Sequence, residues 1–86
     1  MNKKIDETMQ LMEMAANKMT NAILDVADKK GEVVYEIIVD DTCGFTEYRT
    51  IEPDGTIYDE NGCKCDKINN LTFDELYNVC KYINKD

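Results

Sequence analysis

The chain has 86 residues, with 18 acidic side chains, 10 basic side chains and no histidine, which gives a net charge of −8 at pH 7. This length allows one domain at most, here residues 1–86, and the 43% of hydrophobic residues excludes wholesale disorder. The acidic balance disfavours direct binding to nucleic acid or to an anionic membrane, because both need clustered Lys and Arg, and it favours a basic protein partner.

The charge imbalance lies in the middle of the chain. The segment from Glu32 to Asp66 holds ten acids and two bases, so its balance is 2 − 10 = −8, whereas the two flanks each have equal numbers of acids and bases. No run approaches the roughly 18 apolar residues of a membrane span, and the start MNKKIDETMQ lacks the apolar segment of a signal peptide. We expect a cytoplasmic protein with reduced thiols.

The first predicted element is a long amphipathic helix from Lys3 to Lys30, ended by Gly31. Its apolar or small residues recur in steps of four and three, at Ile5, Met9, Met12, Ala16, Met19, Ile23 and Val26. Such a helix is about 40 Å long and exceeds a strand of eight residues, which reaches about 26 Å, so its start must overhang the sheet. This geometry is compatible with a monomer and equally with a homodimer, in which the overhanging start of the helix pairs with a second copy of the chain. Its interface would contain Ile5, Met9, Leu11 and Met12.

Four strands follow, over residues 33–39, 45–52, 56–59 and 63–68. The first is rich in β-branched residues, and Pro53, Asp54 and Gly55 form a strong hairpin signal between the second and third. The alternation places Val33 and Val39 on one face of the first strand and Val34 and Asp40 on the other. We predict an antiparallel meander.

A second helix begins after Thr72 and ends near Asn84. Thr72 and Glu75 have the spacing of a capping box. Its predicted buried stripe contains Phe73, Leu76, Tyr77, Cys80 and Ile83. The fold class is therefore α+β, with a long N-terminal helix, a three- to four-stranded antiparallel meander and a C-terminal helix.

No pattern of catalytic residues stands out. The absence of histidine removes the commonest general base, and adjacent acids in turns are usually solvated. The spacing of Cys43, Cys63, Cys65 and Cys80 differs from the paired ligands of zinc sites, so inert thiols are favoured over a metal. We expect no enzyme, no cofactor and no metal site.

The strands offer the best candidate site, a sheet face that mixes apolar anchors with carboxylates. Apolar residues provide affinity on such a surface, and rim carboxylates steer a basic partner. The predicted partner-binding residues are Glu36, Asp40, Asp41, Glu47, Glu52, Asp54, Asp59 and Glu60. Two pairing phases stay open: one brings Ile51 and Ile57 to this face, and the other brings Tyr48 and Tyr58. The alternative is that the last helix covers this face and the acids only solubilise the chain.

In its size, acidic charge and order of elements, over most of the chain and without a shared motif, the sequence resembles small phage-encoded inhibitors of host defence, such as anti-CRISPR proteins. More distantly it is similar to acidic immunity proteins that neutralise nucleases. The resemblance implies a viral inhibitor whose carboxylates occupy a channel in the place of phosphates. Two other hypotheses are an oligomer that sequesters a signalling nucleotide and a structural or regulatory homodimer.

Overall fold

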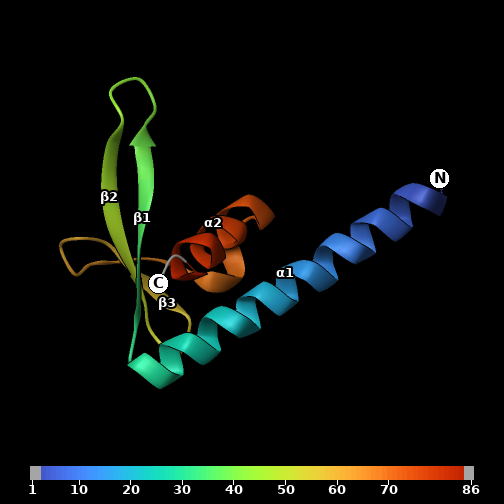
Figure 1. The fold of residues 1–86 in the computed structure, drawn as a ribbon, viewed down its shortest axis with the longest axis horizontal. Coiled ribbons are helices and arrows are strands. Elements are labelled where there is room, and N and C mark those ends of the chain that lie inside the picture. Colours follow the sequence, from blue (N-terminus) through green and yellow to red (C-terminus); the bar gives the residue numbers. More distant parts are fainter. Residues whose placement is uncertain (1–2, 85–86) are drawn as a thin grey trace.

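The computed structural model describes the backbone of residues 3–84 and the side chains of residues 7–84. It confirms the helix–meander–helix order and the α+β class (Figure 1). The elements are α1 (Lys3–Lys30), β1 (Val33–Asp40), β2 (Phe45–Ile51), β3 (Thr56–Tyr58), β4 (Lys64–Lys67), a 3-10 turn η1 (Ile68–Asn70) and α2 (Phe73–Asn84). Neither helix in this described part has the length and hydropathy of a membrane span.

Helix α1 ends where the sequence predicts. Gly31 adopts a φ of 92°, which an L side chain rarely tolerates, and its N–H donates to the Ala27 carbonyl at 2.7 Å. Only the C-terminal half of the helix packs: Met19 and Ile23 contribute to the core, whereas every described side chain from Glu7 to Met14 is exposed. Figure 1 shows the N-terminal half projecting beyond the rest of the fold.

The four strands form an antiparallel sheet in the order β1-β2-β3-β4. Val33 pairs with Ile51, and Ile51 pairs with Ile57, so these three side chains share one face. Both helices cover this face (Figure 1), and the core is built there. Its buried members are Ile23, Ala27, Val33, Tyr35, Ile51, Ile57, Ile68, Leu76 and Val79.

The opposite side of the sheet, which we call the open face, contains Val34, Glu36, Ile38, Thr46, Tyr48, Thr50 and Tyr58. Of the two pairing phases, the structure therefore has the one that places Tyr48 rather than Ile51 on this face. No helix in the described part of the chain covers it, and Val34 and Ile38 are 44% and 64% exposed. The alternative in which the last helix covers this face is wrong, because both helices pack on the Tyr35 side of the sheet.

Strand β1 contains an irregularity that the sequence pattern does not reveal. The pairing register with β2 shifts between Ile38 and Asp40, so Val39 has no partner and the alternation of faces is interrupted. Asp40 then pairs with Phe45, in the same phase as the core residues, and Val39 is 45% exposed. The prediction that Asp40 lies on the same face as Val34 is therefore wrong.

Helix α2 begins with the predicted capping box. The Glu75 N–H donates to Thr72 Oγ1 at 3.2 Å, and the Thr72 N–H donates to Glu75 Oε1 at 3.0 Å. The buried stripe differs in part from the prediction, since Leu76 and Val79 are buried and Tyr77 is 55% exposed. The buried stripe of α2 includes Val79 because the helix packs against both α1 and β1.

Candidate functional site

Three of the eight predicted partner-binding acids accept backbone hydrogen bonds within turns. Asp40 Oδ1 accepts the Thr42 N–H at 2.9 Å, and Asp54 Oδ1 accepts the Thr56 N–H at 2.9 Å. Asp59 Oδ1 accepts two N–H groups in its turn, from Asn61 at 2.9 Å and Cys63 at 3.0 Å. These short-range bonds shape the loops.

The turn bonds also keep two of these carboxylates charged. The Cys43 thiol donates to Asp40 Oδ2 at 3.2 Å, and this bond, with the Thr42 N–H, lowers the pKa of Asp40. The Thr56 backbone N–H likewise lowers the pKa of Asp54. Both side chains are exposed, so they present full negative charges to solvent at neutral pH.

Glu47 differs from the other seven because it is neutralised. Its Oε2 accepts from Arg49 Nη1 at 2.8 Å, in the only ion pair between described side chains. The Glu47 carboxylate in turn raises the pKa of the Arg49 guanidinium. Glu47 pairs with Ile37 on the helix-covered face of the sheet, so it contributes little to an acidic surface.

Glu36 and Glu60 flank Tyr48 on the open face. The Tyr48 N–H donates to Glu60 Oε1 at 2.9 Å, and a hydrogen bond to the Glu36 carboxylate raises the pKa of the Tyr48 phenol. Tyr48 pairs directly with Glu36 across the strands and is 47% exposed. An aromatic ring between two carboxylates suits the recognition of a cationic side chain.

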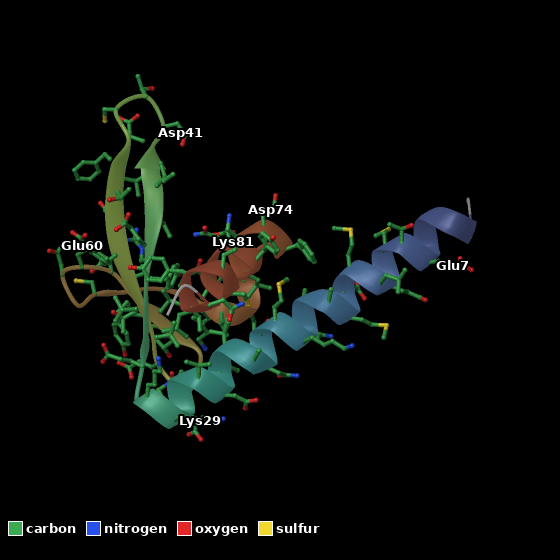
Figure 2. All side chains as sticks on the ribbon, in the orientation of Figure 1. Glu7, Lys29, Asp41, Glu60, Asp74 and Lys81 are labelled. Atoms are coloured by element: carbon green, nitrogen blue, oxygen red, sulfur yellow. The ribbon has the colours of Figure 1, made fainter. Side chains whose placement is uncertain are left out.

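The remaining acids lie at the ends of the sheet. Asp41 lies at the tip of the β1–β2 hairpin (Figure 2), next to Asp40 at the end of β1, whereas Glu52 and Asp54 follow β2 at the other end. The eight residues therefore form separate groups, and the structure does not join them into one continuous row.

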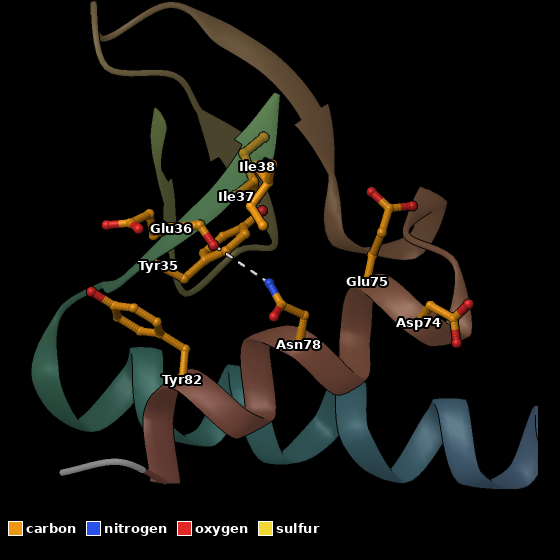
Figure 3. Close-up of a pocket in the computed structure, with 8 residues that line it drawn as sticks. All are labelled: Tyr35, Glu36, Ile37, Ile38, Asp74, Glu75, Asn78 and Tyr82. Carbon is orange, nitrogen blue, oxygen red and sulfur yellow. Dashed lines mark hydrogen bonds between the residues drawn. The ribbon is translucent and has the colours of Figure 1, made fainter. Parts of the chain in front are cut away.

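A groove between β1 and α2 brings together residues that sequence reasoning did not connect (Figure 3). It has a volume of about 550 Å³. Its lining residues are Tyr35, Glu36, Ile37, Ile38, Asp74, Glu75, Asn78 and Tyr82. Three of the lining residues are acidic, and none is Lys or Arg. Asn78 spans the groove, since its Nδ2 donates to the Glu36 carbonyl at 3.4 Å.

Asp74 and Glu75 are the functional candidates that the sequence analysis missed. The capping-box spacing assigned Glu75 a structural role, and nothing in the chain indicates that the first turn of α2 lies opposite β1. An available signal was the net acidity of that turn, which has two acids and no base.

The thiols and carboxylates form no evident metal centre. Cys43, Cys63 and Cys65 are exposed free cysteines, and burial raises the pKa of the Cys80 thiol. Among the described residues, no three Cys, Asp or Glu side chains are grouped in a way that would hold a metal ion.

The predicted dimer residues lie on the projecting half of α1. Leu11 is 65% exposed, and Met9 and Met12 are also exposed, as is the neighbouring Met14. Ile5 falls outside the described side chains. These exposed apolar residues, Met9 and Met12 on one side of the helix and Leu11 and Met14 on the other, are together called the α1 patch below.

In comparisons with known proteins, no family model matches the chain, and no curated protein or solved structure is significantly similar to it. The function is therefore argued from the surfaces described above.

Proposed function

We propose that this protein is a non-enzymatic inhibitor or adaptor that binds a basic protein through the side of the sheet where the open face meets the groove. The resemblance to small phage-encoded anti-defence proteins supports an inhibitor that acts inside an infected cell. The partner's cationic surface is one that otherwise meets phosphates or acidic substrates.

One observation carries the proposal. Asp74 and Glu75 of α2 line the groove, Glu36 lies on the adjoining open face with the exposed side chains of Val34 and Ile38, and none of the three acids has an ion-pair partner among the described residues. A hydrophobic surface bordered by uncompensated carboxylates combines contact area with electrostatic steering. The last turn of α2 contains Lys81, but that base does not line the groove.

The same charges disfavour the nucleotide hypothesis at this groove. A nucleotide brings phosphates, which require Arg, Lys or clustered backbone N–H donors. The groove instead offers three carboxylates, and Tyr35 and Tyr82 are its only aromatic lining residues. The charge favours a cationic protein over an anionic small molecule.

Affinity capture from a lysate of a bacterial host, followed by binding measurements with the purified captured protein, tests the proposal. The site variant carries Glu36→Gln, Asp74→Asn and Glu75→Gln, which remove three charges and retain the hydrogen-bond acceptors. The control variant carries Glu7→Gln, Glu13→Gln and Asp25→Asn, which remove three exposed charges from α1. The net charge is then the same in both variants.

We expect the site variant to bind the basic partner about tenfold more weakly than the control variant, because each exposed charge pair contributes modestly and the three add. The control variant should remain close to the wild-type protein. Equal affinities of the two variants would show that net charge alone drives association and would contradict the proposal.

A structural homodimer is the second candidate, and the α1 patch favours it. Four large apolar side chains on a projecting helix are an unusual surface for a monomer. Leu11→Glu with Met12→Glu should convert a dimer into a monomer in sedimentation velocity. Gln10→Glu with Asn17→Glu, which adds the same charge at exposed polar positions of α1, should leave the dimer intact. A monomeric wild-type protein would remove this candidate.

A further inference from the structure

We infer that β1 accepts an extended segment of the partner as a fifth strand of the sheet, with basic side chains of that segment entering the groove. The inference rests on the proposed function and specifies the form in which the basic partner is recognised. It follows from the position of β1, from the direction of its backbone groups and from the charge of the groove.

Strand β1 is at the edge of the sheet, and β2 is its only neighbouring strand. The Glu36 carbonyl accepts from Asn78 of α2, so it points away from β2. Backbone groups alternate in direction along a strand, and therefore Val34 and Ile38, two residues to either side, also point their N–H and C=O groups outward. These three residues present a row of donors and acceptors, and among the described residues the Asn78 side chain is the one seen to hydrogen-bond to it.

Apart from α2, whose Asn78 reaches the Glu36 carbonyl, the described chain lacks the protections usual for edge strands. β1 is eight residues long and has no Pro or Lys, and its Val34 and Ile38 side chains are exposed. The bulge at Val39 comes only at its end. Helix α2 runs beside the edge with the groove between them, and Figure 3 shows the Asn78 side chain reaching from α2 to the Glu36 carbonyl.

The Asn78 bond occupies a place that an incoming backbone N–H would take. At 3.4 Å it is near the long limit for a hydrogen bond, so exchanging it for a backbone donor costs little. An edge strand with available backbone groups binds extended peptides by main-chain hydrogen bonds, and side-chain pockets supply specificity.

The acidic charge of the groove determines which kind of segment binds there. Side chains of an added strand alternate between the open face, beside Val34 and Ile38, and the groove, beside Asp74 and Glu75. A segment that alternates apolar and basic residues satisfies both sides. A second copy of β1 does not, because pairing centred on Glu36 would place two Glu36 carboxylates directly opposite each other.

The test uses the intact protein and a capped eight-residue peptide that alternates Val and Lys, matched in length to β1. Amide hydrogen exchange and chemical shifts are followed by NMR during titration at low salt. We expect the amides of Val34, Glu36 and Ile38 to become at least about tenfold more protected, because they gain hydrogen-bond partners in the complex. The matched Val–Glu peptide should not bind.

Two N-methylated peptides of identical charge give the decisive control. In an antiparallel fifth strand, the residues whose N–H groups face β1 have their side chains on the open face, which are the Val residues. Methylation of the Val nitrogens should abolish binding, whereas methylation of the Lys nitrogens should leave it unchanged. If both methylated peptides bind equally, or neither binds, the fifth strand is refuted.

A variant of the protein supplies the complementary test. Ile38→Pro removes an outward N–H at an edge position where Pro is tolerated, and Ile38→Thr makes the same side chain polar and keeps the N–H. We expect Pro to weaken peptide binding about tenfold or more and Thr to change it less than about threefold. If the Pro variant does not fold, the methylated peptides still decide.

The outcomes separate this inference from the proposed function. Salt-dependent binding of the Val–Lys peptide without protection of the β1 amides overturns the fifth strand and leaves the acidic surface standing. No binding of either peptide up to about 1 mM overturns the fifth strand, while the capture experiment with the site variant judges the proposed function independently. Protection of the β1 amides by raising the protein concentration alone would identify a second copy as the occupant and also overturn the inference.

Discussion

Several carboxylates of this protein have a structural task that is separable from their charge. Asp54 is an example, because its Oδ1 holds the Thr56 N–H at the start of β3 while the side chain remains exposed. Asp54→Asn keeps the acceptor and removes the charge, whereas Asp54→Ala removes both. We predict a lower melting temperature for the Ala variant and a nearly unchanged one for the Asn variant in calorimetry. Equal destabilisation by both would assign the role of Asp54 to its charge.

Tyr35 makes a prediction about alkaline stability. Burial raises its pKa from 10.0 to about 12, so the folded state holds the phenol proton more tightly than the unfolded state does. The stability that the protonated Tyr35 phenol contributes is therefore fully present below about pH 10 and is lost as the pH rises from 10 through 12. Urea unfolding should show a decline of stability over this range that is shallower in Tyr35→Phe. An identical decline in both proteins would locate the titrating group elsewhere, for example at Cys80.

At the scale of the elements, the first turn of α2 serves both folding and the groove. Thr72→Ala removes one half of the capping box and should cost about 1 kcal/mol of the free energy of unfolding. Glu75→Gln keeps the other half, since Gln also reaches back to the Thr72 N–H, and should change the stability by less than about 0.5 kcal/mol. Urea denaturation measures both. A loss of stability in the Gln variant as large as in the Ala variant would show that the site variant cannot report on charge alone.

The same scale shows how far the sequence predicts the fold. The bounds of α1 and the start of α2 are local properties, since a periodic apolar stripe, Gly31 and the Thr72–Glu75 spacing determine them. The bulge at Val39 and the burial of Val79 are not local. They depend on how β1 pairs with β2 and on how α2 packs between α1 and the sheet. Pattern reasoning therefore placed Asp40 on the wrong face.

For the candidate site too, the local features were predictable from the sequence and those that depend on packing were not. The sequence identified Glu36 and Glu60 as surface acids beside an aromatic strand, because charge and alternation are visible in the chain. It did not identify the groove, because Asp74 and Glu75 come to lie beside β1 only through the packing of α2 along the edge of this strand. It also counted Glu47 among the binding residues, although the structure pairs that carboxylate with Arg49.

At the scale of the whole molecule, the net charge of −8 is spread over the hairpin tip, the open face, the turns and the groove, while one ion pair joins the described residues. Such a field extends over about a Debye length, near 8 Å at physiological ionic strength, and accelerates encounters with a cationic partner. The groove then determines where the partner settles. Long-range attraction and short-range recognition are thus assigned to overlapping but different sets of acids.

The association rate constant with the captured basic partner, measured by stopped flow as the salt concentration rises from about 0.05 to 0.5 M, tests this account most directly. The account predicts that the rate constant falls by at least about tenfold over this range. It also predicts that the variant with Glu36→Gln, Asp74→Asn and Glu75→Gln has a clearly shallower dependence on salt than the variant with Glu7→Gln, Glu13→Gln and Asp25→Asn. A rate constant that is independent of salt, or the same salt dependence in both variants, would contradict the claim that this acidic surface binds a basic protein.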